Sequence, residues 1–89
     1  METLSERELR VIHNELMYAD LMSGKDSFKL RGITVFLTMQ PNGTGLGCWY
    51  QGHSFWRGPE MTGVYGYRHE DMRFYYIDDE IIKHWYVKV

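Results

Sequence analysis

The apolar residues of this chain change their spacing once, from a helical repeat near the N-terminus to a two-residue repeat further on. Leu9, Ile12, Leu16 and Ala19 recur at intervals of three and four, which predicts one face of an amphipathic helix. From Phe28 onward apolar and polar residues alternate, which predicts strands with one buried face. We therefore expect the α+β class, with one N-terminal helix packed on an antiparallel sheet of about four or five strands.

The predicted helix has a well-marked start. Ser5 is suited to be the N-cap, and Glu8, three residues later, completes a capping box. Leu4 and Leu9 have the spacing of a hydrophobic staple, which fixes how the chain enters a helix. These signals predict a helix from Glu6 to about Met22.

Turn residues divide the alternating region into strands. The alternation shifts by one at Gly32, which indicates a β-bulge or a tight bend, because glycine adopts the backbone angles that both require. Pro41-Asn42-Gly43 predicts a turn, and Leu46 to Gln51 the returning strand of a hairpin. Further strands are predicted at Val64–Tyr67 and Met72–Ile77.

Three segments are harder to assign. Gly52 to Gly63 is irregular and rich in aromatic residues, so we expect a packed or functional loop. Asp78-Asp79-Glu80 reads as a turn. Ile81 to Val89 fits either a helix face or a strand, and its Ile and Val content favours the strand.

Length and composition predict a single domain spanning residues 1–89, since 89 residues are too few for two cores. With 44% hydrophobic residues the chain can build a core. No apolar run is long enough to span a membrane, and the N-terminus is acidic where a signal peptide is basic. Cys48 is the only cysteine, so an intramolecular disulfide is excluded. We expect a cytoplasmic protein that makes no membrane contact.

The charge distribution bears on the choice of partner. The formal net charge is −2, which argues against a chain held to nucleic acid by bulk electrostatics. Only the middle third, from Lys25 to Glu60, carries more basic than acidic residues.

A dense group of aromatic residues begins in this middle third and continues beyond it to Tyr67. A domain this short has a limited interior, so we expect some of the rings to reach the surface. Trp, Tyr and Arg dominate binding hot spots because they combine large rigid area with a polar group. The alternative, that most rings build a tight core, stays open. The predicted binding residues are Trp49, His53, Phe55, Trp56, Arg57, Tyr67 and Arg68.

A glycine-rich stretch precedes these residues. It lacks the helix that a dinucleotide-binding fingerprint must open, because a strand-like Cys48-Trp49-Tyr50 follows. In a strand, Gly43, Gly45 and Gly47 would leave a strip without side chains on one face. Such a strip suits an anion-binding loop, or else a hairpin end crossed by an aromatic ring of the protein.

The candidates for chemistry are weak. Cys48 with His53, and the acidic residues between 70 and 80 with His69 or His84, match no known catalytic spacing. We expect no catalytic residues, no metal and no cofactor.

The function expected from these observations is that of a non-enzymatic binding protein. It would act as a small inhibitor or interaction module, occupying a site on another protein through an aromatic and arginine surface. One alternative is a binder that sequesters or senses an anionic, nucleotide-like molecule. A second is a nucleic-acid binder, which the net acidity disfavours. A homodimer is also expected if the terminal strand, Ile81 to Val89, leaves its edge open.

Overall fold

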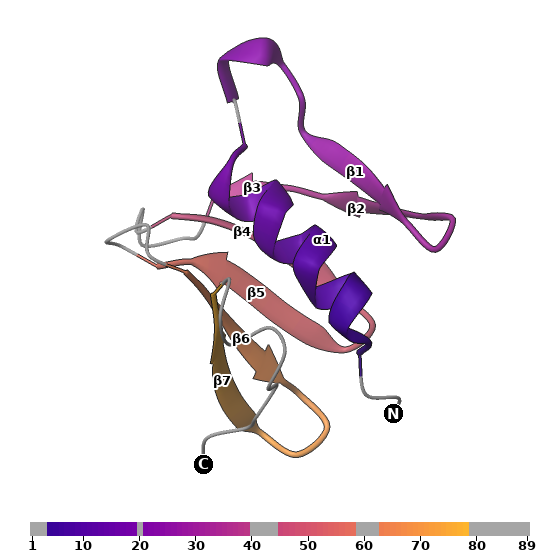
Figure 1. The fold of residues 1–89 in the computed structure, drawn as a ribbon, viewed down its shortest axis with the longest axis vertical. Helices are drawn as coiled ribbons and strands as arrows, with labels where there is room; N and C mark the ends of the chain where they lie inside the picture. The colour runs from indigo at the N-terminus through magenta and orange to yellow at the C-terminus, as the bar shows by residue number, and fades with distance from the viewer. Residues whose placement is uncertain (1–3, 20, 40–44, 59–62, 79–89) are drawn as a thin grey trace.

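The computed structural model describes residues 4–19, 21–39, 45–58 and 63–78 (Figure 1). Helix α1 (Glu6–Met17) comes first, then a short 3-10 helix, η1 (Leu21–Ser23). The strands follow in the order β1 (Ser27–Leu30), β2 (Ile33–Phe36), β3 (Thr38–Met39), β4 (Leu46–Tyr50), β5 (His53–Arg57), β6 (Val64–Arg68) and β7 (Arg73–Ile77). The predicted α+β class, with one N-terminal helix and an antiparallel sheet of five strands, is confirmed.

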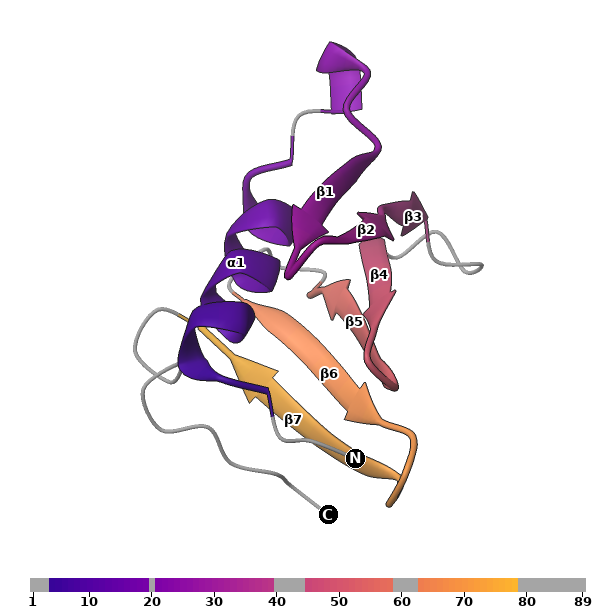
Figure 2. The same cartoon turned by 90° about the vertical axis from the view of Figure 1, so that its right-hand side faces the viewer.

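The strands form two antiparallel groups. β1 and β2 make a two-stranded ribbon, while β3 to β7 make a five-stranded sheet in which each strand pairs with the next along the chain. Helix α1 contacts β1, β5 and β6 and lies across one face of this structure (Figures 1 and 2). No described helix or strand covers the opposite face of the five-stranded sheet.

The predicted helix start is confirmed in detail. Ser5 Oγ accepts a hydrogen bond from the Glu8 N–H, and Glu8 Oε1 accepts one from the Ser5 N–H, each at 3.1 Å. Leu4 and Leu9 are both buried in the core. The helix ends at Met17, five residues before the predicted end, and Ala19 packs against the core from beyond the helix. Apolar spacing therefore continues past the last helical turn.

Two hairpins turn through a pair of adjacent residues with positive φ. At the end of β1, Arg31 and Gly32 have φ of 53° and 77°, and between β4 and β5, Gln51 and Gly52 have 51° and 79°. Positive φ at both central residues is typical of the type I′ turn, whose twist matches that of the flanking strands. The predicted tight bend at Gly32 is thus a complete chain reversal.

Segment 53–57 is β5, where the sequence predicted a loop from Gly52 to Gly63. For residues 53–57 that prediction is wrong, because β5 is the middle strand of the five and pairs on both sides, while residues 59–62 lie outside the described residues. His53 and Phe55 point to the buried face and alternate with Ser54 and Trp56. Because the polar residue His53 occupies a buried position, the two-residue hydrophobic period of β5 is not evident from the sequence.

Other strand predictions are confirmed. β6 and β7 coincide with the strands predicted near 64–67 and 72–77. β3 pairs with β4, with Thr38 opposite Gly47, so the predicted hairpin exists. Its turn residues, 41–43, lie outside the described residues, as do Asp79, Glu80 and the predicted terminal strand 81–89.

The core fills the space between α1, the β1–β2 ribbon and one face of the sheet. Its members are Leu4, Leu9, Ile12, Leu16, Phe28, Leu30, Val35, Leu37, Leu46, Cys48, Tyr50, Phe55, Val64, Tyr75 and Ile77. A methyl group built on Gly66 would overlap the Tyr75 ring, so the missing side chain lets this ring lie across β6. Among the described residues, no helix has the length and apolar character needed to cross a membrane.

Candidate binding surface

The sheet face turned away from α1 is the candidate site. Because side chains alternate along each strand, the pairing register assigns every residue of β3 to β7 to one face. We call the surface turned away from the helix the open face. Its residues are Thr38, Gly47, Trp49, Ser54, Trp56, Tyr65, Tyr67, Phe74 and Tyr76.

Six of these nine residues are aromatic and none is charged. Trp49 is 62% exposed, Phe74 52% and Tyr65 40%, while Trp56, Tyr67 and Tyr76 are partly buried. Rings this exposed are unusual for a surface that serves only to protect a core. The opposite face of the same strands carries the buried core residues, so the aromatic content of the open face is in excess of what packing needs.

Five of the rings form a continuous cluster across β5, β6 and β7. Trp56 stacks on Tyr65 with ring centres 5.9 Å apart, and Tyr65 lies 5.1 Å from Tyr76. Phe74 lies 4.6 Å from Tyr67 and meets Trp56 edge-on at 6.4 Å. These contacts link the five rings into one continuous aromatic surface.

Trp49 stands on the far side of Ser54 from this cluster, because Ser54 lies between Trp49 and Tyr67 in the cross-strand row. A hollow of about 370 Å³ opens beside it, at the junction of β2 with the sheet. A second exposed ring, that of Phe36 on β2, borders the hollow and is 63% exposed. The lining residues are Thr34, Phe36, Thr38, Cys48, Trp49 and Ser54.

The polar side-chain groups of this face are the hydroxyl groups of its Ser, Thr and Tyr residues and the indole N–H groups of its Trp residues. Ser54 Oγ lies 2.7 Å from His69 Nε2, a hydrogen-bond distance, and the His69 ring meets Tyr67 edge-on at 4.7 Å. The face can therefore donate hydrogen bonds from hydroxyl and indole groups without presenting a full charge from its own strands.

Three of the predicted binding residues, Trp49, Trp56 and Tyr67, lie together on the open face. Sequence reasoning missed Tyr65, Phe74 and Tyr76, which complete the open face, and also Phe36, which borders the hollow beside it. The signal for them was present as alternation, since Phe74 and Tyr76 occupy every second position of β7. The density of aromatic residues indicated this region of the chain, but it did not indicate which residues of each strand share a face.

His53 and Phe55 lie on the other face and are fully buried, so the expectation that they share an exposed surface is wrong. Their rings stack with centres 5.8 Å apart, and His53 Nδ1 lies 3.0 Å from the Tyr75 hydroxyl. Burial, assisted by the positive charge of Arg68, lowers the pKa of His53 to about 4. The imidazole is therefore neutral near pH 7 and belongs to the core.

The two predicted arginines are also separate from the open face. Arg57 lies on the helix side and donates a hydrogen bond to the Leu16 carbonyl at 3.3 Å, tying β5 to α1. Arg68 donates to the Asp71 carboxylate through both Nε and Nη2, and this hydrogen bonding lowers the pKa of Asp71. Each arginine thus has an internal partner.

The predicted glycine strip is only partly described, because Gly43 lies outside the described residues. A side chain on Gly45 would come within 2.8 Å of the Arg57 carbonyl oxygen, so close strand contact accounts for this glycine. Gly47 lies on the open face between Thr38 and Trp56. An aromatic ring does cross a glycine elsewhere in the sheet, where Tyr75 lies over Gly66.

The structure describes only part of the residues that the sequence offered for chemistry, since Asp79, Glu80 and His84 lie outside the described residues. Cys48 is buried, and burial raises the pKa of its thiol to about 12, so the reactive thiolate is scarce near neutral pH. In the described part of the chain, no three His, Cys, Asp or Glu side chains cluster as a metal would require.

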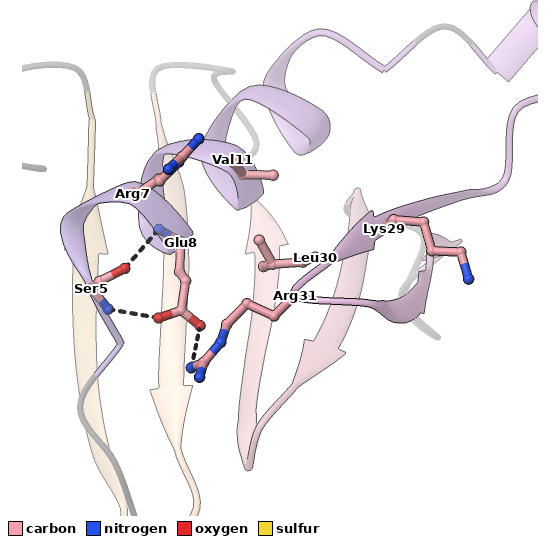
Figure 3. Close-up of a pocket in the computed structure, with 7 residues that line it drawn as sticks. All are labelled: Ser5, Arg7, Glu8, Val11, Lys29, Leu30 and Arg31. Atoms are coloured by element: carbon pink, nitrogen blue, oxygen red, sulfur yellow. Dashed lines mark hydrogen bonds and ion pairs between the residues drawn. The ribbon is translucent and has the colours of Figure 1, made fainter.

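A larger hollow, of about 570 Å³, lies on the helix side between α1 and the β1–β2 turn (Figure 3). Its lining includes Glu8, whose carboxylate pairs with Arg31 Nη1 at 3.6 Å. Burial alone would raise the pKa of Glu8, but hydrogen bonds from Ser5 and Tyr50 and the charge of Arg31 bring it below its ordinary value. The charged ends of Arg7 and Lys29 point away from this carboxylate. The hollow therefore contains an internal ion pair that joins helix and ribbon.

The chain matches no protein-family model, and comparison with curated proteins and with solved structures finds no significant match.

Proposed function

We propose that this chain is a non-enzymatic binding protein, an inhibitor or interaction module that recognises another protein through the open face. The observation that carries the proposal is the combination of exposed rings and absent charge at nine neighbouring positions of one sheet face. The centres of protein interfaces are enriched in aromatic residues and depleted in charged ones. A cytoplasmic setting is part of the proposal, supported by a single cysteine that is free and buried.

The uncharged character favours a protein partner over the two alternatives. A nucleotide or nucleic acid needs basic groups near its phosphates, and phosphate contacts dominate nucleic-acid affinity. Arg57 and Arg68, the two arginines among the predicted binding residues, are engaged with Leu16 and Asp71. Both alternatives therefore have less support than a protein partner.

The proposal can be tested by site-specific crosslinking in cells. A photoreactive phenylalanine analogue placed at Phe74 should crosslink the chain to a specific partner, whereas the same analogue at Tyr18 should not. Tyr18 is the matched control because it is exposed at the end of α1, away from the open face.

The captured partner should then bind the purified protein in a titration. Trp49→Ala should weaken that binding by about tenfold or more, the size expected for a hot-spot residue, and leave the melting temperature unchanged. Equal crosslinking from Tyr18, or saturable binding of a nucleotide lost in Trp49→Ala, would contradict the proposal.

A further inference from the structure

The open face differs from the usual outer face of an antiparallel sheet. Such a sheet commonly buries one face in the core and presents a polar face to water. In this sheet six of the nine residues on the open face are aromatic and none is charged. An uncharged face can meet a second copy of itself without the like-charge repulsion that a basic or an acidic patch would suffer. The composition of the open face is therefore compatible with self-association.

The two ends of the open face differ in shape. One cross-strand row contains, in order from β3 to β7, Thr38, Gly47, Trp56, Tyr65 and Tyr76. Its three rings thus lie on β5, β6 and β7, and the exposed ring of Phe74 also lies on β7. The hollow of about 370 Å³ lies at the other end, beside β3 and β4, where Phe36 and Trp49 are part of its lining. One end therefore carries a projecting ring and the other end carries a hollow.

A two-fold axis parallel to β5 brings these two ends together. Because β5 is the middle strand of the five, rotation about this axis makes two facing sheets overlap fully, with β7 of each copy over β3 of the other. Phe74 and Trp49 belong to one cross-strand row, so Phe74 of each copy comes over the hollow beside Trp49 of the other. An axis across the strands would instead place hollow against hollow and β7 against β7.

The hollow is large enough for this contact. An apolar cavity of about 150 Å³ can hold a benzene molecule, so a hollow of about 370 Å³ has room for the phenyl ring of Phe74. The ring would lie between two others, since Phe36 and Trp49 are 63% and 62% exposed beside the hollow. Aromatic pairs contribute beyond the area that they bury.

The exposed area is also sufficient for a dimer. The four most exposed rings of this region are those of Phe36, Trp49, Tyr65 and Phe74. They are 40–63% exposed, and a ring of this kind has about 150–250 Å² of surface, so together they offer roughly 400 Å² per copy. A standard interface buries about 800 Å² per partner. The half-buried rings and the small residues of the face contribute the remainder, so two facing copies can form a reversible dimer.

We propose that, when no other partner is bound, the open face binds a second copy of the chain in a two-fold sandwich, with Phe74 of each copy in the hollow of the other. The sheets then pack face to face, as in a β-sandwich. The second copy and the partner use the same face, so a partner must displace one copy to bind. This competition rests on the proposed function, whereas the dimer itself does not.

Sedimentation of the full chain from about 1 μM to about 1 mM tests the dimer, and a concentration-dependent dimer is expected. Each residue occurs twice in a two-fold interface, so Trp49→Ala should weaken dimerisation by about a hundredfold, roughly tenfold for each copy. Phe36→Ala is an independent second variant with the same expected effect, and Tyr18→Ala, on the helix side, should change dimerisation less than about twofold. Melting temperatures show that each variant is folded. A chain that stays monomeric throughout, or a dimer that neither variant weakens, overturns the inference.

Crosslinking tests the arrangement of the two copies. The photoreactive phenylalanine analogue is placed at Phe74 in a purified mixture of isotope-labelled and unlabelled protein, so that products of mixed isotope content come from two copies. These products should join residue 74 to residues around the hollow, such as Phe36 or Trp49. Products that join residue 74 to β7 of the other copy would indicate an axis across the strands and overturn the inference.

Addition of the partner captured in cells separates this inference from the proposed function. The partner should convert the dimer into a complex with a single copy of the chain. If the dimer behaves as expected but no partner is captured, the proposed function fails and the dimer stands. If a partner binds through the open face of a chain that is always monomeric, the proposed function stands and the inference fails. A partner that binds the intact dimer would overturn the competition.

Discussion

Tyr50 donates a hydrogen bond from its hydroxyl to Glu8 Oε2 over 2.9 Å, linking β4 to the first turn of α1. The two residues are 42 positions apart, and the contact is buried. The same carboxylate completes the capping box and pairs with Arg31 on the β1–β2 turn. Glu8 therefore joins three elements that are distant in sequence.

Removing this hydroxyl should destabilise the fold. Tyr50→Phe keeps the buried ring and deletes only the donor, so we expect the free energy of unfolding to fall by about 1.5–3 kcal/mol, as for hydrogen bonds to charged groups. Urea denaturation measures the change. Tyr65→Phe removes a hydroxyl from a residue that is 40% exposed, and it is the control. Equal stability of wild type and Tyr50→Phe would contradict the prediction.

The lowered pKa of Glu8 also predicts how the stability of the fold changes with pH. Because the folded-state pKa lies below the ordinary value of 4.5, the unfolded chain binds the proton first on acidification. The stabilisation that ionised Glu8 contributes to the fold is complete above pH 4.5, and it is lost as the pH falls through the lower pKa of the folded state. The loss on acidification should be smaller in Tyr50→Phe, which lacks one of the hydrogen bonds that lower the pKa.

The N-cap should contribute to stability and not to binding. Ser5→Ala removes the acceptor for the Glu8 N–H and should cost about 1 kcal/mol, the usual value for a lost side-chain cap. Partner binding should stay at the wild-type level because Ser5 lies on the helix side of the sheet. Thermal unfolding and a binding titration check both expectations, and an unchanged melting temperature would show that the cap contributes nothing.

Buried His53 predicts a second, milder acid effect. Its folded pKa of about 4 lies below the ordinary 6.5, so between these values only the unfolded chain gains the proton. Stability should therefore fall as the pH drops through this window, by roughly 1 kcal/mol between about pH 7 and 5.5. His53→Asn should lose this component of the slope. An identical slope in both proteins would mean that His53 does not titrate differently on folding.

Gly66 should tolerate no side chain. A methyl group there would overlap the Tyr75 ring, and overpacking of a core typically costs about 1–3 kcal/mol. Gly66→Ala should lower the melting temperature, whereas Ser54→Ala on the neighbouring strand should leave it nearly unchanged. If Gly66→Ala melts like the wild type, the ring has room to move aside.

The parts of the fold that the sequence predicted are those governed by near neighbours. Ser5 and Glu8 are three residues apart, so the helix start could be read locally. The same holds for β7, where alternation within five residues is sufficient.

Strand β5 was missed because its pattern depends on distant residues. His53 is buried through a contact with Tyr75, which lies 22 positions away. The side on which each ring lies depends on the strand register, where a slip of one residue would exchange the two faces. That register follows from the Gln51–Gly52 turn. Composition could therefore locate the aromatic region but could not separate Trp56 from Phe55.

The state of Cys48 has a practical consequence for labelling. As the only cysteine in the chain, and with a thiol pKa raised to about 12, it should resist alkylating reagents while the protein is folded. A new cysteine at the exposed position of Phe36 would then be the one reactive thiol. A fluorescent dye or a spin label could be attached there in a single step, without first replacing Cys48, and would report directly on events beside Trp49.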